Sequence, residues 1–172
     1  MKKLLLTFLF LPLFCFGQDI VKPQHIVKIG EDAPDFTLRY LDGKTAKLSD
    51  LNGKVIMLQF TASWCSVCLK EIPFIEKEIW QKYKDNKDFV LVGIDFKEGK
   101  NQIKKFVKAA KISYQLLLDK NGSIFELYAE KGAGVTRNII IDKNGKIAFL
   151  TRLFNQEEFE SMKAKIYELL KK

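Results

Sequence analysis

Cysteine and histidine are scarce in this sequence, which holds three cysteines and one histidine among 172 residues. A small secreted domain stapled by disulfides needs more cysteines, and a structural zinc site needs about four cysteine or histidine ligands. The three cysteines are Cys15, Cys65 and Cys68, and the histidine is His25. A bridge from Cys65 to Cys68 would close a very short loop and so add little stability. The scarcity therefore argues against a disulfide scaffold and a metal site, and it indicates a chemical role for the close pair.

Long hydrophobic runs are absent as well, apart from residues 4–16. This run follows two lysines and is shorter than the roughly 20 residues that cross a bilayer. Cys15 and Gly17 place small residues three and one positions before Gln18, which is the pattern of a signal-peptide cleavage site. We therefore predict a signal peptide over residues 1–17, cleaved after Gly17, and an extracytoplasmic, periplasmic protein. An uncleaved N-terminal anchor is one alternative; a lipoprotein acylated at Cys15 is another, disfavoured because Phe14 rather than a small residue precedes the cysteine.

Low-complexity linkers, internal repeats and basic blocks are also missing. The formal net charge is +8, but the lysines are scattered among acidic residues without interleaved aromatics. This pattern is typical of a solvated surface, and no nucleic-acid partner is expected. The remaining length suits one core. We predict an irregular lead over residues 18–30 and a single domain over residues 31–172.

Hydrophobic periodicity predicts an α/β domain. Residues 55–60 and 89–94 are mostly apolar runs, as in strands that are buried on both faces. Further predicted elements are a hairpin at 36–48, a helix at 65–84 that kinks at Pro73, a helix at 103–110, a strand at 114–118, a helical turn at 123–128, a hairpin at 138–150 and a helix after Asn155 that buries Phe159, Met162, Ile166, Leu169 and Leu170. Alternating strands and helices followed by a hairpin indicate a mixed sheet.

The cysteine pair lies between a predicted buried strand and the helix over residues 65–84. Cys65 therefore falls at a helix N-terminus, where free N–H groups and the helix dipole stabilise a thiolate. Cys68, one turn later, is placed to attack a mixed disulfide formed at Cys65. Half of a zinc site and an inert structural bridge are the alternatives; zinc is disfavoured because further ligands are lacking.

Several motifs resemble the TlpA/ResA branch of the thioredoxin superfamily. They extend from about residue 31 to residue 150 and comprise Ala33-Pro34-Asp35-Phe36-Thr37-Leu38, Asp42-Gly43-Lys44, Leu48-Ser49-Asp50-Leu51, Gly53-Lys54, the run from Phe60 to Cys68, Glu71-Ile72-Pro73 and the run from Ile141 to Lys146. The resemblance implies a thioredoxin-like fold: a mixed central β-sheet flanked by helices, with an N-terminal β-hairpin and a central strand–helix insertion.

The resemblance also implies a function. Members of this branch look like extracytoplasmic proteins that reduce disulfides in exported proteins such as apocytochromes c. By this analogy the chain would need a membrane electron donor, such as a thiol-reducing transmembrane protein. We expect a monomer whose redox centre is the Cys65–Cys68 disulfide, with no other cofactor and no metal.

The resemblance suggests further site residues. Glu71 corresponds to a glutamate that handles protons for the cysteines, and Gln59 stands where many cytosolic thioredoxins have a buried aspartate. Thr136 stands where the family has a cis-proline facing the cysteines, so its preceding peptide is expected to be trans because a non-proline cis bond costs about 2.5–4 kcal/mol. Partner docking is expected beside Trp64 and along the Val135-Thr136 backbone.

Two other functions remain open at this point. A thiol peroxidase is disfavoured because Ala62 and Leu58 stand where peroxiredoxins have a threonine and a proline. A redox-inactive binding module is opposed by the intact cysteine pair. Within the oxidoreductase hypothesis, Ser66 and Val67 bring no positive charge between the cysteines, which favours a reductant over a strong oxidant.

Overall fold

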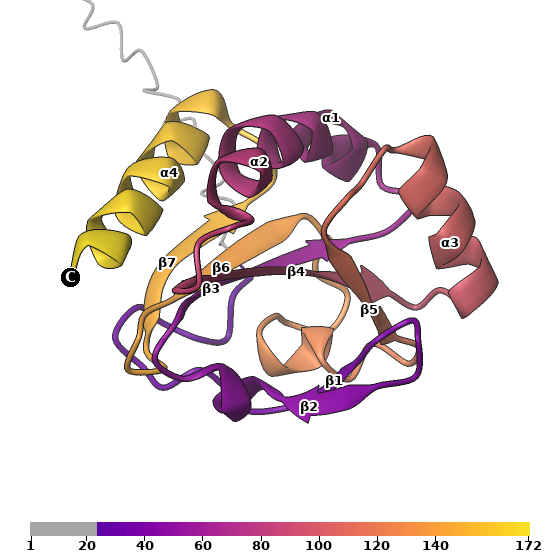
Figure 1. The fold of residues 1–172 in the computed structure, drawn as a ribbon. Coiled ribbons are helices and arrows are strands. Elements are labelled where there is room, and N and C mark those ends of the chain that lie inside the picture. Colours follow the sequence, from indigo (N-terminus) through magenta and orange to yellow (C-terminus); the bar gives the residue numbers. More distant parts are fainter. Residues whose placement is uncertain (1–23) are drawn as a thin grey trace, which may run out of the picture.

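A central five-stranded sheet organises the molecule, whose computed structural model describes residues 24–172 (Figure 1). The predicted signal peptide and its cleavage site lie outside these residues. The strand order is β5-β4-β3-β6-β7, in which β3, β4 and β5 run parallel and β6 and β7 pair antiparallel. The strands are β3 (Val55–Thr61), β4 (Phe89–Phe96), β5 (Gln115–Asp119), β6 (Arg137–Ile141) and β7 (Ile147–Arg152). This is the predicted mixed sheet of a thioredoxin-like fold.

Helices cover one face of this sheet (Figure 1). They are α1 (Ser66–Phe74), the π-helix η2 (Ile75–Trp80), α2 (Gln81–Tyr83), α3 (Lys100–Ala109) and α4 (Gln156–Lys171). The predicted apolar face of the first helix is buried, and Ile72, Ile75 and Ile79 pack with Met57 of β3 and Phe159 of α4 in one core. The spacing of apolar residues therefore predicted the buried faces correctly.

The helix predicted over residues 65–84 contains a change of register. Pro73 lies in the last turn of α1, and the π-helix η2 begins two residues later. Proline has no N–H to donate to the preceding turn, which weakens the α-helical hydrogen-bond ladder at this point. The Ile75 N–H is accordingly shared between the carbonyls of Glu71 and Ile72. The expected disturbance at Pro73 thus takes the form of a wider helical turn.

The opposite face is covered by the predicted N-terminal hairpin, β1 (Thr37–Arg39) and β2 (Thr45–Lys47), and by the short helices η1 (Leu48–Leu51) and η3 (Phe125–Leu127) (Figure 1). The hairpin turns at Gly43, whose φ of 95° suits glycine. Phe60 of β3 packs edge-on against Phe125, with ring centroids 5.6 Å apart. A second core thus fills this side.

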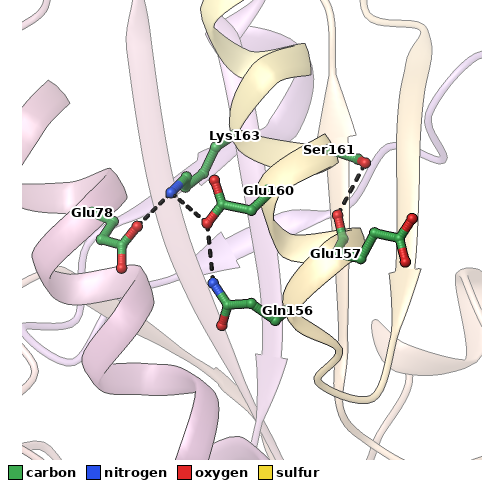
Figure 2. Close-up of polar contacts among 6 residues, drawn as sticks. All are labelled: Glu78, Gln156, Glu157, Glu160, Ser161 and Lys163. Atoms are coloured by element: carbon green, nitrogen blue, oxygen red, sulfur yellow. Dashed lines mark hydrogen bonds and ion pairs between the residues drawn. The ribbon is translucent and has the colours of Figure 1, made fainter.

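Helix α4 closes the fold from the C-terminal end. Asn155 caps it by accepting the Glu158 N–H at 3.0 Å, as predicted, and Phe159, Met162 and Ile166 are buried. The expected burial of Leu169 and Leu170 was wrong in degree: both are half-buried, in the last helical turn. Figure 2 shows Lys163 of α4 contacting Glu78 of η2 and Glu160 of its own helix. Each such partly exposed ion pair contributes at most about 1 kcal/mol to the free energy of unfolding.

None of the helices within residues 24–172 combines the length and the apolar character needed to cross a membrane.

Candidate active site

The two cysteines lie where strand β3 passes into helix α1. Cys65 is the N-cap of α1, its Sγ accepts the Cys68 N–H at 3.2 Å, and a disulfide joins the two residues. Cys65 is 7% exposed whereas Cys68 is fully buried. Because Cys65 keeps some exposure and Cys68 has none, Cys65 is the residue of the pair that an incoming disulfide can reach. The predicted roles of attacking Cys65 and resolving Cys68 fit this difference in exposure.

A carboxylate that the sequence analysis missed holds the loop before Cys65. Glu98, between β4 and α3, accepts the Ser63 N–H and the Ser63 hydroxyl, both at 2.6 Å. Gln102 of α3 donates to the same hydroxyl at 3.0 Å. These bonds fix the chain two residues ahead of Cys65. Nothing in the local pattern around Glu98 marks it, since an isolated loop glutamate is usually solvated.

A second carboxyl, Asp95, is fully buried at the end of β4, opposite Thr61 in the sheet. Burial and the neighbouring Glu98 charge raise the pKa of Asp95 to about 8, so it holds its proton at neutral pH. When ionised, neither of its oxygens has a hydrogen-bond donor in the described chain. The available sequence signal for Asp95 was an acidic residue directly after the apolar run of residues 89–94.

Glu71 is buried on α1, one turn after Cys68. Its Oε1 accepts the Asn138 amide at 2.7 Å, and its Oε2 has no partner among the described residues. Burial raises the pKa of Glu71 to about 7; the Asn138 bond opposes this rise and the Glu158 charge adds to it. Gln59 is buried too and accepts the Tyr114 hydroxyl at 2.6 Å. Glu71 can therefore gain or lose a proton near neutral pH, whereas Gln59 cannot.

Thr136 contacts both sulfur atoms directly. Its hydroxyl lies 3.1 Å from the Cys65 Sγ and 3.2 Å from the Cys68 Sγ, and the residue is 3% exposed. The peptide before it is trans. Its carbonyl accepts the Leu153 N–H at 3.1 Å. The family resemblance predicts the Thr136 backbone beside the dithiol, whereas no feature of the sequence marks the hydroxyl.

Three large apolar residues adjacent to the pair or to Thr136 are partly exposed. Trp64, Leu69 and Leu153 are 63%, 44% and 45% exposed. They come from the loop before α1, from α1 itself and from the chain after β7. Val135, by contrast, is buried. The predicted docking role of Trp64, Val135 and Thr136 stays a prediction.

Arg137 anchors the loop that carries Thr136. It is fully buried and donates to the carbonyls of Gly134 at 2.7 Å and Gln24 at 3.3 Å. Its guanidinium also stacks 4.9 Å over the Phe125 ring and lies 3.3 Å from the His25 Nδ1. Burial and Arg137 lower the pKa of His25 to about 4, so the ring stays neutral and can accept this bond.

The described residues contain no cluster of three or more histidine, cysteine or acidic side chains that could hold a metal ion.

Comparison with known proteins agrees with this geometry. Residues 29–150 match the AhpC/TSA family. The chain is 33% identical over 115 residues to the thiol-disulfide oxidoreductase ResA of Bacillus cereus. The matched region covers 67% of this chain and 65% of the ResA protein. It is 34% identical over 97 residues to the thioredoxin-like protein YneN of Bacillus subtilis, covering 56% of each.

Solved structures show the same likeness. A candidate protein disulfide isomerase from Bacteroides thetaiotaomicron is 56% identical with a TM-score of 0.84, over 87% of this chain and 94% of that one. A candidate thiol:disulfide interchange protein DsbE from Chlorobium tepidum is 29% identical with a TM-score of 0.73, over 84% and 99%. The chain therefore belongs to the AhpC/TSA family, as a ResA-like member with a thioredoxin-like fold.

Proposed function

We propose that this protein is an exported thiol–disulfide oxidoreductase that reduces disulfides of extracytoplasmic proteins. The observation that carries the proposal is the Cys65–Cys68 disulfide at the N-terminus of α1, in which Cys65 is slightly exposed and Cys68 is fully buried. The likeness to ResA and to a DsbE-like structure supports it. The apolar N-terminal segment supports export.

The proposed cycle starts from the reduced pair. The Cys65 thiolate attacks one sulfur of the partner disulfide, forming a mixed disulfide and releasing the other partner sulfur as a thiolate. Cys68 then loses its proton and attacks the Cys65 sulfur, which expels the second partner thiolate. The partner gains two electrons and two protons, and the pair is oxidised. A membrane thiol reductase would return these electrons.

Glu71 is the proposed proton acceptor for Cys68. Its buried position one turn away and its pKa near 7 suit a base at neutral pH. Replacement of Glu71 by glutamine is expected to slow resolution of the mixed disulfide by about a hundredfold, near the low end for a positioned acid or base. The inflection near pH 7 in the rate should disappear.

Stopped-flow measurement of resolution across pH tests this role, with the exposed Glu126→Gln as the matched control. Equal rates and equal pH profiles in Glu71→Gln and the wild type would leave Glu71 as a structural residue alone.

The apolar surface of Trp64, Leu69 and Leu153 suits partners that present unfolded, apolar chain around their disulfide, such as exported apocytochromes c. Such a surface binds weakly and without strict sequence preference, which a general reductase needs. Docking along the Val135-Thr136 backbone belongs to the same proposal.

The reduction potential of the pair is the experiment that tests the proposed function. Equilibration with defined thiol buffers is expected to give a value near or below about −220 mV, as for reductants of this fold. A value near about −120 mV would instead indicate an oxidant that introduces disulfides. Without a reversible two-electron couple, the redox-inactive binding module would replace the proposal, and rapid peroxide consumption would favour the peroxidase.

A further inference from the structure

We propose that the Thr136 hydroxyl is a catalytic hydrogen-bond donor that stabilises the thiolate of Cys65 and then that of Cys68. This inference rests on the proposed function, and it concerns a group that the family resemblance does not supply, since the family has proline at this position.

The first argument is geometric. The Thr136 Oγ1 lies 3.1 Å and 3.2 Å from the two sulfurs, so a small rotation of the hydroxyl hydrogen redirects it from one to the other. Among the described residues, these two sulfurs are its hydrogen-bonding partners. Thr136 is buried, so water offers the hydroxyl little competition.

The second argument is chemical. In the disulfide the sulfurs are weak acceptors, but a thiolate is a charged acceptor, and hydrogen bonds to charged groups are roughly twice as strong as neutral ones. The hydroxyl therefore stabilises the reduced pair more than the oxidised pair. It adds to the Cys68 N–H, which already donates to the Cys65 Sγ at 3.2 Å. Proline could not contribute such a bond because it has no hydroxyl.

The donor would act twice in each cycle. It first lowers the energy of the Cys65 thiolate before attack on the partner disulfide. Once Cys65 is bound in the mixed disulfide, its sulfur is neutral, and the hydroxyl turns to the Cys68 thiolate, which attacks Cys65 and expels the partner thiolate. No electron or proton passes through Thr136; it holds its own proton between two alternative acceptors.

Thr136→Val tests the inference because valine keeps the shape and removes the hydroxyl. The titratable groups near the pair include Glu71 on α1, Asp95 at the end of β4, Glu98 on the β4–α3 loop and Arg137 beside Thr136, and the substitution alters none of these side chains. In the reduced protein we expect the pKa of Cys65 to rise by about one unit, a tenfold loss of thiolate. The reduction potential should fall by about 30 mV, which corresponds to that tenfold change.

The measurements are the pH dependence of Cys65 alkylation and equilibration with thiol buffers. Thr136→Ser should restore both values because it keeps the hydroxyl, and Thr136→Ala should repeat the valine result if valine impairs folding. The matched control is Thr61→Val, at a buried threonine whose hydroxyl has no partner in the described chain; it should leave both values unchanged.

The outcomes separate this inference from the proposed function. If the wild type has a reversible couple and Thr136→Val and Thr136→Ala keep its pKa and potential, the hydroxyl merely packs and the inference is wrong. If the wild type itself has no couple, the proposed function fails and the inference falls with it.

Discussion

Replacement of Cys68 by serine is expected to leave a protein that attacks a disulfide once and then stays covalently bound to its partner. Cys65 keeps its slight exposure and its place at the N-terminus of α1, so formation of the mixed disulfide should continue. Resolution needs the buried sulfur one turn away, which serine cannot replace. Turnover should drop to the uncatalysed rate while a stoichiometric adduct accumulates, visible by mass spectrometry and non-reducing electrophoresis.

Cys65→Ser is the matched control for the trap. It retains one cysteine, but that cysteine is fully buried, so little or no adduct should form. The chain from Gln18 onward contains no other thiol, so each adduct is assigned without ambiguity. Efficient trapping by Cys65→Ser, or undiminished turnover in Cys68→Ser, would reverse or remove the roles assigned to the two sulfurs.

Asp95→Asn is expected to stabilise the protein, and increasingly so as the pH rises. Burial and Glu98 raise the pKa of Asp95 to about 8, so the folded state keeps a proton that the unfolded chain loses near its ordinary pKa of 3.8. The contribution of Asp95 to the free energy of unfolding is fully present below pH 3.8 and is lost as the pH rises to about 8. Asparagine resembles the protonated acid and never ionises, and it removes a penalty of up to about 1.4 kcal/mol per pH unit.

Urea unfolding from pH 5 to pH 8.5 measures this effect. The difference in the free energy of unfolding between Asp95→Asn and the wild type should grow by up to about 4 kcal/mol across the range. Two other groups also make stability depend on pH, and their contributions cancel when the two proteins are compared. The raised pKa of Glu71, about 7, lowers stability as the pH rises, as Asp95 does. The lowered pKa of His25, about 4, increases stability as the pH rises to about 6.5. The exposed Asp85→Asn is the control, and parallel curves for all three proteins would show that Asp95 is not held protonated.

Local sequence patterns were sufficient for the elements and for the cysteine pair. Apolar runs gave β3 and β4, the Asp42-Gly43 turn gave the first hairpin, and the capping Asn155 gave the start of α4, because each signal lies within a few neighbouring residues. The placement of Cys65 at the N-terminus of a helix followed from the strand before it. The family motifs then predicted the sheet as a whole.

The polar supports of the site could not be found in the same way. Glu98 contacts Ser63 across 35 positions of sequence, and Asn138 contacts Glu71 across 67. The first contact depends on how the parallel strands β3 and β4 end at one edge of the sheet, and the second depends on how α1 lies against the antiparallel strand β6. No local pattern records either arrangement. The hydroxyl of Thr136 was missed for a related reason: the comparison with a proline directed attention to the backbone at that position.

The buried Arg137 joins two segments that lie far apart in the sequence. Its guanidinium donates to the carbonyl of Gln24 and to the carbonyl of Gly134, in the loop that carries Thr136 to the dithiol. The two segments therefore share one buried anchor, so loss of the Arg137 side chain would release the loop beside the sulfurs and the segment at Gln24 together.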